Sequence, residues 1–396
     1  MSNESQNRKS KLLKPRIALL INAFWNSGAG ISGGDQRAMQ IFKRIGRDFD
    51  IDIYTSKDGE KVIGGEIKSA NYIISPEKFG KGNILLRYRR RANWLLKKLI
   101  LKKYDLIYSS SDFFPDVLPA YEYKINNPET KWVSCVFHIY PNWLKRPGNK
   151  VVNLIGSEIQ NFSFSRIRKL ADRIININFQ VRDELVNKYH FDKKKIAINP
   201  CGIDLEYFSK IKTTKNNLQV CFLARLAYSK GISDLAPIWE EVVKQVPKAK
   251  LLIIGGGSDE IKRKLKDSLA DTKISDNNVG ILGFLENDQA YKILKASKLF
   301  IFPSHEEGFG ISIAESLACG VPVVAWDLPV YREVFPDSVF TVKIGNYKSM
   351  ARVIIKILED NTESKKVLQQ GRNVIQKYSW EGIACEEKKI INKLLK

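Results

Sequence analysis

The sequence predicts an α/β protein with two doubly wound, Rossmann-like domains that face each other across a central cleft. Short and nearly continuous apolar runs alternate with amphipathic stretches, a pattern typical of parallel strands that are buried on both faces. The runs fall into two successive series, which indicates two doubly wound units. A length of 396 residues exceeds that of one ordinary hydrophobic core and supports the same division.

Each series supplies five candidate strands. They are predicted at 17–23, 51–54, 106–108, 132–137 and 174–177, and then at 219–223, 250–254, 279–282, 299–302 and 321–325. The polar segment between the series lacks periodicity and is typical of a linker, whereas the end of the chain has the pattern of an amphipathic helix. We therefore expect a flexible basic lead, a first domain, a linker, a second domain and a C-terminal helix, at 1–15, 16–204, 205–217, 218–379 and 380–396.

The charge of the chain is unevenly distributed. Of the net charge of +22, residues 1–210 carry +16 and the remainder carries +6, so an anionic partner of the first domain is expected. The five cysteines form no C-x-x-C pair, which argues against a disulfide framework and a zinc site. No apolar run approaches the roughly 18 residues of a membrane-spanning helix. These features favour a cytoplasmic protein, with peripheral attachment to the inner face of the cell membrane as a further hypothesis.

The most informative stretch is 303–315. Two carboxylates, Glu307 and Glu315, stand eight residues apart around a turn made of Gly308, Phe309 and Gly310. The turn follows an apolar strand and opens an amphipathic helix, whose N-terminal amides attract phosphate or sugar oxygens. If the helix has already begun at the first carboxylate, both carboxylates lie on roughly the same face.

This stretch resembles the E-x7-E signature of retaining glycosyltransferases with the GT-B fold, in particular glycosyltransferase family 4 (glycosyl transferases group 1). The continuation Ala318-Cys319-Gly320-Val321-Pro322-Val323-Val324-Ala325 is similar to that family's A-x-G-x-P-V-V-A pattern. The resemblance covers residues 16–390 and implies a C-terminal helix that crosses back onto the first domain. It also implies that Glu315 accepts hydrogen bonds from the ribose of a nucleotide-sugar, and that Glu307 orients the sugar ring.

Two cations, Arg225 and Lys230, follow the first strand of the second series. Their segment is similar to the family's G-R-L-x-x-x-K-G motif, with Ala224 in place of the first glycine and Gly231 at the expected spacing. The resemblance implies that both cations bind the donor diphosphate, and positive charge stabilises a nucleoside diphosphate as it leaves. We therefore expect a metal-independent reaction with a UDP- or GDP-linked sugar as substrate and no cofactor.

Four further site residues are implied by the resemblance. Gly33 and Gly34 end a glycine-rich loop after the first strand and would face the donor phosphate and the acceptor, although Gly28, Gly30 and Gly33 match G-x-G-x-x-G poorly. His138 ends the strand predicted at 132–137, where ligands of doubly wound sheets gather, and would contact the donor sugar. The family often has Asp at the next position, which is Ile139 in this chain. Leu285 follows a turn that often meets the nucleobase.

The pair Asp50 and Asp52 spells the D-x-D metal motif of a different transferase fold. The pair lies in a predicted strand, where alternate side chains share one face and are drawn into the sheet. We therefore expect no metal site at this pair.

The stretch from Arg87 to Lys103 contains eight basic residues and no acidic residue. Drawn as a helix, it has one apolar arc that can pack on the sheet, while Trp94 falls on the opposite side among cations. A tryptophan surrounded by cations suits the headgroup region of an anionic bilayer, so the predicted membrane contacts are Trp94, Arg90, Lys97 and Lys98. The alternative is an ordinary solvated helix, and no nucleic-acid-binding module is evident.

Taken together, the residues and the resemblance favour a retaining glycosyltransferase that moves a hexose-type sugar from a nucleotide-sugar to a saccharide or lipid-linked acceptor. Surface polysaccharide or glycolipid assembly is the expected context. Three alternatives remain open: a sugar-nucleotide epimerase, a phosphorylase, and a non-catalytic protein that binds anions or membranes. An epimerase would show no acceptor dependence, a phosphorylase would need inorganic phosphate, and a non-catalytic protein would lack nucleotide-sugar affinity.

Overall fold

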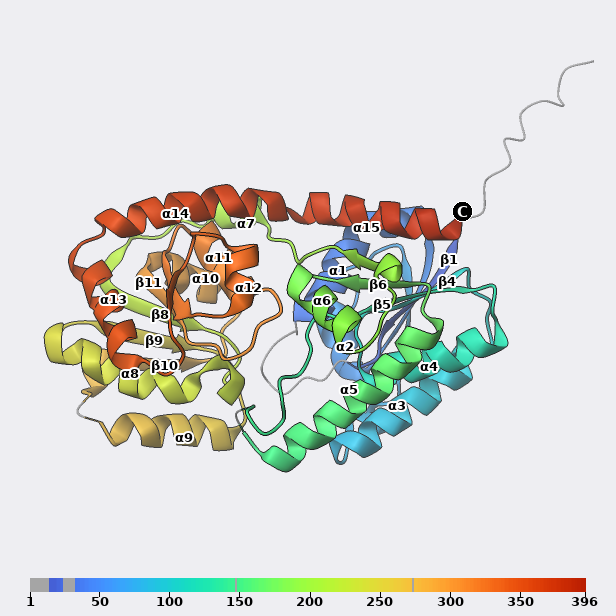
Figure 1. The fold of residues 1–396 in the computed structure, drawn as a ribbon, viewed down its shortest axis with the longest axis horizontal. Helices are drawn as coiled ribbons and strands as arrows, with labels where there is room; N and C mark the ends of the chain where they lie inside the picture. The colour runs from blue at the N-terminus through green and yellow to red at the C-terminus, as the bar shows by residue number, and fades with distance from the viewer. Residues whose placement is uncertain (1–13, 24–32, 147, 273) are drawn as a thin grey trace, which may run out of the picture.

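The computed structural model describes residues 14–23, 33–146, 148–272 and 274–396, apart from the side chain of Asn217. Most of the predicted basic lead, together with Gly28 and Gly30 of the glycine-rich loop, lies outside the described residues. The chain folds into two α/β domains that lie side by side, and the last two helices run along one side of both (Figure 1).

The first domain is built on a parallel sheet of seven strands in the order β3-β2-β1-β4-β5-β6-β7. The order reverses beside β1, which is the mark of a doubly wound sheet. The strands are β1 (Arg16–Ile21), β2 (Asp50–Thr55), β3 (Ala70–Ile74), β4 (Leu106–Ser109), β5 (Lys131–Cys135), β6 (Arg173–Asn176) and β7 (Ile196–Ile198).

The second domain repeats this plan with six parallel strands in the order β10-β9-β8-β11-β12-β13. The order reverses beside β8, so both sheets present a crevice at the carboxyl ends of their central strands. The strands are β8 (Asn216–Leu223), β9 (Lys250–Ile254), β10 (Val279–Gly283), β11 (Ser297–Phe302), β12 (Val323–Trp326) and β13 (Phe340–Val342).

Every strand predicted from the two apolar series is present, and the predicted fold class is confirmed. The sequence reasoning missed three strands, β3, β7 and β13, and all three lie at an edge of a sheet. Two of them, β7 and β13, have only three residues each, which is too short for a distinctive apolar run, and β3 contains Asn71 and is not fully buried at any position.

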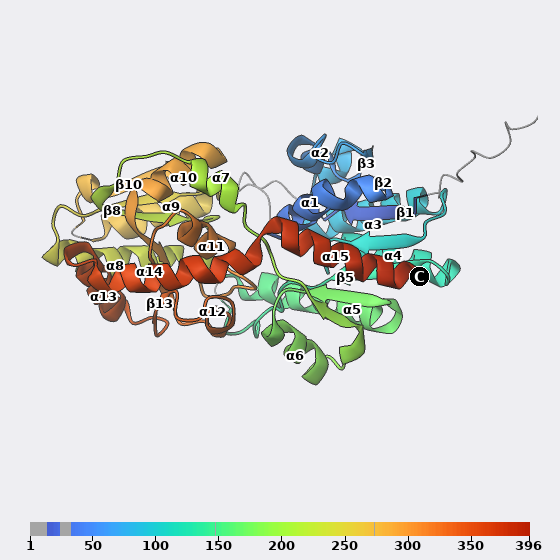
Figure 2. The same cartoon turned by 90° about the horizontal axis from the view of Figure 1, so that it is seen from above.

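Helices cover both faces of each sheet (Figures 1 and 2). Asparagine and serine residues cap several of them at the N-terminus, such as Asn83 before α3 and Asn149 before α5, because their side chains accept hydrogen bonds from the first free amides. In the first domain the helices are α1 (Gly33–Ile45), α2 (Lys57–Ile63), α3 (Ile84–Leu99), α4 (Phe114–Asn126), α5 (Lys150–Leu170) and α6 (Phe179–Asn187). In the second domain the helices are α8 (Ile232–Gln245), α9 (Asp259–Ala270), α10 (Asn287–Ala296), α11 (Ile311–Ala318), α12 (Pro329–Val334), α13 (Tyr347–Glu359) and α14 (Thr362–Ile375).

The segment predicted as a linker contains a short helix, α7 (Leu205–Lys210), whose first turn is capped by the side chain of Asp204. A helix of this length spans fewer than two turns, which is too short to show a periodic pattern in sequence. Just before it, the chain passes beside the return crossing to α15: the Ile203 amide donates to the Tyr378 carbonyl at 2.6 Å. The two crossings between the domains therefore support each other.

The C-terminal helix α15 (Trp380–Leu395) lies on α1 of the first domain, as the predicted fold requires (Figure 2). A buried ion pair anchors it, with Arg37 Nη2 2.7 Å from Glu387 Oε2 and both side chains fully buried. The Tyr108 hydroxyl donates to the other Glu387 oxygen at 2.5 Å, and the Asn199 amide donates to Oε2 at the same distance. Buried charges need such partners, so this network fixes where α15 can dock.

The prediction that Trp94 faces outward from the basic helix α3 is wrong. Trp94 is half-buried and packs against the first-domain core, with its ring centroid 6.4 Å from that of Tyr54. Arg91 of the same helix is also buried. Trp94 lies beside the buried apolar stripe of α3, and its large ring can reach sideways into the core. A helical-wheel drawing gives only the angle of each residue and does not show how far a side chain reaches. Arg90, Lys97 and Lys98 are exposed as expected.

Across the described ranges, no helix is both long enough and apolar enough to cross a lipid bilayer. The longest of them, α5, carries four Lys or Arg residues and one Glu.

Candidate active site

A cavity of about 510 Å³ lies between the two domains, at the carboxyl ends of the central strands of both sheets. Side chains from the second domain form most of its wall, and the start of α1 and the segment after β5 close it from the first domain. All of the predicted catalytic and donor-binding residues line this cavity: Gly33, Gly34, His138, Arg225, Lys230, Leu285, Glu307, Gly308, Phe309, Gly310 and Glu315.

The two carboxylates of the E-x7-E signature reach the cavity from different local structures. Glu307 lies in the loop before α11, whereas Glu315 lies inside that helix, so the expectation that they share one helical face does not apply. The Glu307 carboxylate is 2.6 Å from Lys230 Nζ and 2.9 Å from the Ser304 hydroxyl. Glu307 is therefore held within the second domain by its own neighbours.

Glu315 is buried and accepts a hydrogen bond of 2.6 Å from the Tyr291 hydroxyl. Burial raises the pKa of Glu315 to about 7, although the Tyr291 hydrogen bond works in the opposite direction. This carboxyl group therefore changes its charge near neutral pH, which is unusual for a glutamate.

Glycines between the two carboxylates allow the domains to approach closely. A Cβ atom on Gly308 would lie 2.3 Å from the Phe137 carbonyl of the first domain, and the Gly308 carbonyl accepts a hydrogen bond of 2.5 Å from the Asn178 side chain. Gly310 has a φ of 94°, which favours glycine, and it precedes the first turn of α11. The amides of this turn lie at the positive end of the helix dipole, which favours an anion there.

The two predicted phosphate-binding cations occupy different environments. Lys230 pairs with Glu307, while Arg225 is exposed on the cavity wall and has no ion-pair or hydrogen-bond partner among the described residues. The chain path beside Lys230 requires glycine at position 231, because its φ is 76° and a Cβ atom would lie 1.8 Å from the Pro303 carbonyl oxygen. The second-domain wall thus offers an anion the Arg225 guanidinium and the Lys230 ammonium group.

On the first-domain side, His138 lies in the segment after β5, because the strand ends at Cys135 rather than directly before the histidine. Burial lowers the pKa of His138, so the imidazole is neutral at neutral pH and can donate one hydrogen bond and accept another. Gly33 opens α1 beside α11, where a Cβ atom would lie 2.9 Å from the Ile311 side chain. Leu285 lies beyond β10, near the start of α10.

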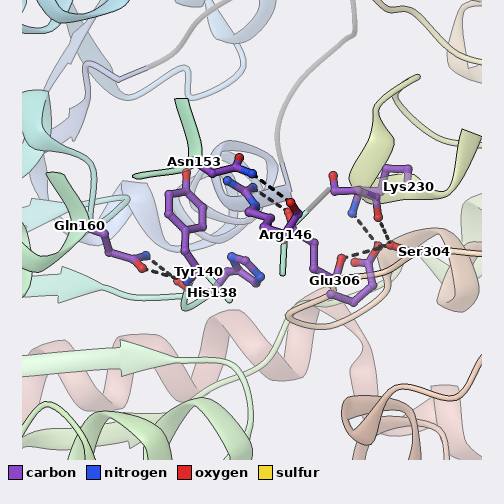
Figure 3. Close-up of polar contacts among 10 residues, drawn as sticks. His138, Tyr140, Arg146, Asn153, Gln160, Lys230, Ser304 and Glu306 are labelled. Atoms are coloured by element: carbon purple, nitrogen blue, oxygen red, sulfur yellow. Dashed lines mark hydrogen bonds and ion pairs between the residues drawn. The ribbon is translucent and has the colours of Figure 1, made fainter. Parts of the chain in front are cut away.

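The sequence reasoning missed three cavity residues that surround His138: Tyr140, Arg146 and Glu306. Figure 3 shows Arg146 of the first domain directed toward Glu306 of the second, with the ring of Tyr140 beside the guanidinium. The sequence carried only a weak signal, the basic and aromatic composition of residues 140–146. The partner of Arg146 is 160 residues away in the chain, so spacing could not reveal it.

No group of three or more potential metal-ligating side chains occurs within the described ranges. Asp52 of the D-x-D pair binds other residues instead, accepting hydrogen bonds from Lys102 at 2.8 Å and Tyr104 at 2.6 Å. Burial alone would raise the pKa of Asp52, but these hydrogen bonds hold it below its usual range. Its contacts are those of a structural carboxylate in β2.

Two family models match the chain, one for each half. Residues 32–207 match the model described as Glycosyltransferase Family 4, and residues 204–374 match the model described as Glycosyl transferases group 1. The two matches meet at the crossing between the domains and together span most of the chain.

Curated relatives include the poly(glycerol-phosphate) alpha-glucosyltransferase of Bacillus subtilis, which is 32% identical over 160 residues, or 40% of this chain and 23% of that protein. The alpha-monoglucosyldiacylglycerol synthase of Acholeplasma laidlawii is 23% identical over 328 residues, with 79% of each chain covered. The chain spans between about a quarter and three fifths of the length of the first curated relatives it matches.

Solved structures with the same fold include sucrose-phosphate synthase from Thermosynechococcus elongatus, with a TM-score of 0.79, 17% identity and coverage of 96% of this chain and 99% of that chain. Anabaena HepE in complex with UDP and glucose has a TM-score of 0.73, 15% identity and coverage of 96% and 100%. At such identities the likeness establishes a common fold.

Proposed function

Since this chain belongs to the family 4 glycosyltransferases with the GT-B fold, we propose that it transfers a hexose-type sugar from a nucleotide-sugar to a saccharide or lipid-linked acceptor. The observation that carries this proposal is the cavity of about 510 Å³ between the domains. The second domain contributes two cations, the N-terminus of α11 and two carboxylates to this cavity. The neutral imidazole of His138 lies on the first-domain side.

The donor would bind along the second-domain wall. Glu315 would accept from the ribose hydroxyls, and the diphosphate would lie against Arg225, Lys230 and the amides that precede α11. Lys230 would then be shared between the diphosphate and Glu307, which is left to orient the sugar ring. Because these charges stabilise the diphosphate as it leaves, the reaction would proceed without a metal ion.

The acceptor hydroxyl would enter from the first-domain side, near Gly33, Gly34 and His138, and would attack the face that the leaving group vacates. Attack on that face would retain the configuration at the sugar carbon. The leaving phosphate would take the hydroxyl proton, so no protein base is needed. Contact between the domains would exclude water and limit hydrolysis of the donor. The names of the curated relatives, which include glycolipid and poly(glycerol-phosphate) glucosyltransferases, support glycolipid or surface-polysaccharide assembly as the setting.

The first experiment is calorimetric titration of the purified chain with UDP, GDP and ADP, in parallel with Arg225→Ala. We expect selective binding of UDP or GDP that the variant weakens. If none of the three nucleotides binds, the donor assignment is wrong and a non-catalytic protein becomes the better explanation.

Two further measurements address the reaction itself. Glu307→Gln should abolish transfer in a donor-consumption assay while its circular dichroism spectrum stays that of the wild type, and normal turnover would remove Glu307 from the mechanism. The configuration of the product, read by NMR, should match that of the donor. Activity that persists in a chelator would support metal independence.

We also propose that the exposed side of the first domain contacts an anionic membrane surface, with the contact residues revised from those predicted. Arg90, Lys97 and Lys98 stay as candidates because they are exposed, but Trp94 is replaced by apolar side chains at the starts of two helices. These starts lie on the lower side of the first domain in Figure 1 and expose Ile84, Leu85 and Leu86 of α3 and Val151, Val152, Leu154 and Ile155 of α5. Apolar side chains beside cations are typical of interfacial binding.

Co-sedimentation with liposomes that contain anionic lipid tests this surface. Val151→Glu combined with Val152→Glu should weaken binding, whereas Ile125→Glu, at another exposed apolar residue near the end of α4, should not. Equal binding by both variants would contradict the proposed surface.

A further inference from the structure

Two neighbouring carboxylates in the loop that precedes α11, Glu306 and Glu307, form ion pairs with different domains. Glu307 pairs with Lys230 inside the second domain, whereas Glu306 pairs with Arg146 of the first domain (Figure 3). Both glutamates line the cavity of about 510 Å³ and also a second one of about 230 Å³ on the other side. The loop is therefore a thin wall, and its position sets the shape of both cavities.

The contact between Arg146 and Glu306 has the geometry of a strong ion pair. Arg146 Nε is 2.9 Å from one carboxylate oxygen and Nη2 is 2.7 Å from the other, so the pair is bidentate. The guanidinium carbon lies 4.2 Å from the centre of the Tyr140 ring, which adds a cation–π contact. The side chains are only 20% and 10% exposed, so water screens the pair weakly.

The charge state of the pair agrees with this geometry. Burial alone would raise the pKa of Glu306, but the hydrogen-bonded Arg146 and the nearby His138 and Lys230 hold it below its usual range. Burial would also lower the pKa of Arg146, yet Glu306 raises it above its usual value. Both groups are therefore fully charged at neutral pH.

The first domain holds Arg146 in place through its main chain. The Arg146 carbonyl accepts hydrogen bonds from the Asn153 side chain at 3.1 Å and from Lys150 Nζ at 2.8 Å, both in the first turns of α5. The Tyr140 amide donates to the Gln160 side chain at 2.9 Å, and the same Gln160 donates to the His138 carbonyl at 2.9 Å. Arg146 and His138 are thus fixed to the same helix, α5 (Figure 3).

We propose that Arg146 is a positioning residue for sugar transfer: by binding Glu306 across the cleft, it fixes the adjacent Glu307 relative to His138 and so couples domain contact to the geometry of the reacting groups. The inference rests on the proposed function of the cavity. Arg146 acts through Glu306 in this account and does not itself touch the donor.

The physical reason is the cost of an unpaired charge. Without Arg146, the Glu306 carboxylate would remain in a poorly hydrated cleft beside the negative charge of Glu307. The loop would relieve this by moving toward water, and Glu307 would move with it. A displacement of about 1 Å at a reacting group can lower a rate by about 100-fold.

Steady-state kinetics with Arg146→Met, Arg146→Lys and Glu306→Gln tests the proposal. We expect Arg146→Met to lower kcat by about 10- to 100-fold with little change in nucleotide affinity, because Arg225, Lys230 and Glu315 of the second domain would bind the nucleotide. Arg146→Lys keeps the charge but loses the bidentate fork and should be intermediate. Combining Arg146→Met with Glu306→Gln should lose no more activity than Arg146→Met alone, since both changes remove the same contact.

Arg44→Met is the matched control, because Arg44 forms an arginine–glutamate pair with Glu381 of α15 at 2.8 Å, outside the cleft. Its kcat should equal that of the wild type. A second readout follows the domains directly, by the distance between spin labels at Lys169→Cys on α5 and Lys266→Cys on α9, in a Cys385→Ser background. Arg146→Met should broaden this distance distribution, and Arg44→Met should not.

The outcomes separate the two proposals. If the wild type transfers sugar and Arg146→Met does so equally well, or leaves the distance distribution unchanged, Arg146 is not a positioning residue. Additive losses in the double variant would contradict action through Glu306 as well. If the wild type itself binds no nucleotide and transfers no sugar, the proposed function fails, and the inference about Arg146 fails with it.

Discussion

The two walls of the cleft are built in different ways. In the second domain, most of the charged groups that face the cavity come from short segments after β8 and β11, and some bind one another, as Lys230 and Glu307 do. In the first domain, the wall consists largely of backbone and uncharged rings, and its cation, Arg146, finds its partner only across the cleft. One wall is complete within its own domain, whereas the other depends on the contact between domains.

Because of this difference, we expect substitutions in the two walls to have different effects on nucleotide binding and turnover. Changes in the second wall should affect nucleotide binding and turnover together, because the same groups bind the diphosphate and stabilise it as it leaves. Changes in the first wall should spare nucleotide binding and lower turnover. These separate effects require the two domains to be joined correctly. The Arg37–Glu387 ion pair that anchors α15 is therefore the first contact to test.

Glu387→Gln should have the largest effect, a loss of about 3–5 kcal/mol in the free energy of unfolding, because Arg37 would be left buried without its counter-charge. Urea denaturation measures this loss. The neighbouring Glu386→Gln breaks only an exposed pair with Lys389 and should change stability by less than about 0.5 kcal/mol. Equal stability of the two variants would show that the buried network does not anchor α15.

Lys230→Met should lower kcat/KM by about 10²- to 10³-fold and weaken nucleotide binding as well, since it removes a charge that stabilises the leaving diphosphate. Kinetics and calorimetry on the same preparation give both quantities. Lys266→Met, an exposed lysine on α9, is the control. A loss of turnover with intact nucleotide affinity would break the comparison, because Lys230 would then behave like a residue of the first wall.

His138→Ala should lower kcat by about 100-fold and leave UDP or GDP affinity within error of the wild type, since the imidazole lies on the opposite wall from the diphosphate groups. The same calorimetric titration checks the binding half of this prediction. Weakened nucleotide binding in this variant would mean that the donor spans both walls.

Glu315 should give the smallest effect, a pH dependence of donor affinity. With a pKa of about 7, the carboxylate form becomes dominant as the pH rises from 6 to 8, and donor affinity should increase by up to about tenfold because a carboxylate accepts hydrogen bonds better than the acid. Glu315→Gln should flatten the profile. An unchanged profile in that variant would assign the titration to another group.

The same group has a consequence for stability, with the opposite sign. The raised pKa means that the folded state holds a proton between the usual value of 4.5 and about 7, so Glu315 disfavours folding increasingly as the pH rises through that window. Thermal unfolding of Glu315→Gln should lack this contribution.

Sequence alone determined the fold class, the central strands of both sheets and, apart from Glu306, the charged residues of the second-domain wall. Central strands carry continuous apolar runs because both faces are buried, and the residues of the second wall lie within short segments whose spacing the chain itself enforces, from Arg225 to Gly231 and across 303–315.

Only the tertiary structure decided the pairings between distant segments. Arg146 and Glu306 are 160 residues apart, and Arg37 and Glu387 are 350 apart, so no local pattern records either contact. The edge strands and the inward packing of Trp94 depend in the same way on which neighbours the fold supplies. A side chain's burial and partners are properties of the assembled packing, and the cation Arg146 of the first domain gains its carboxylate partner only once the two domains meet.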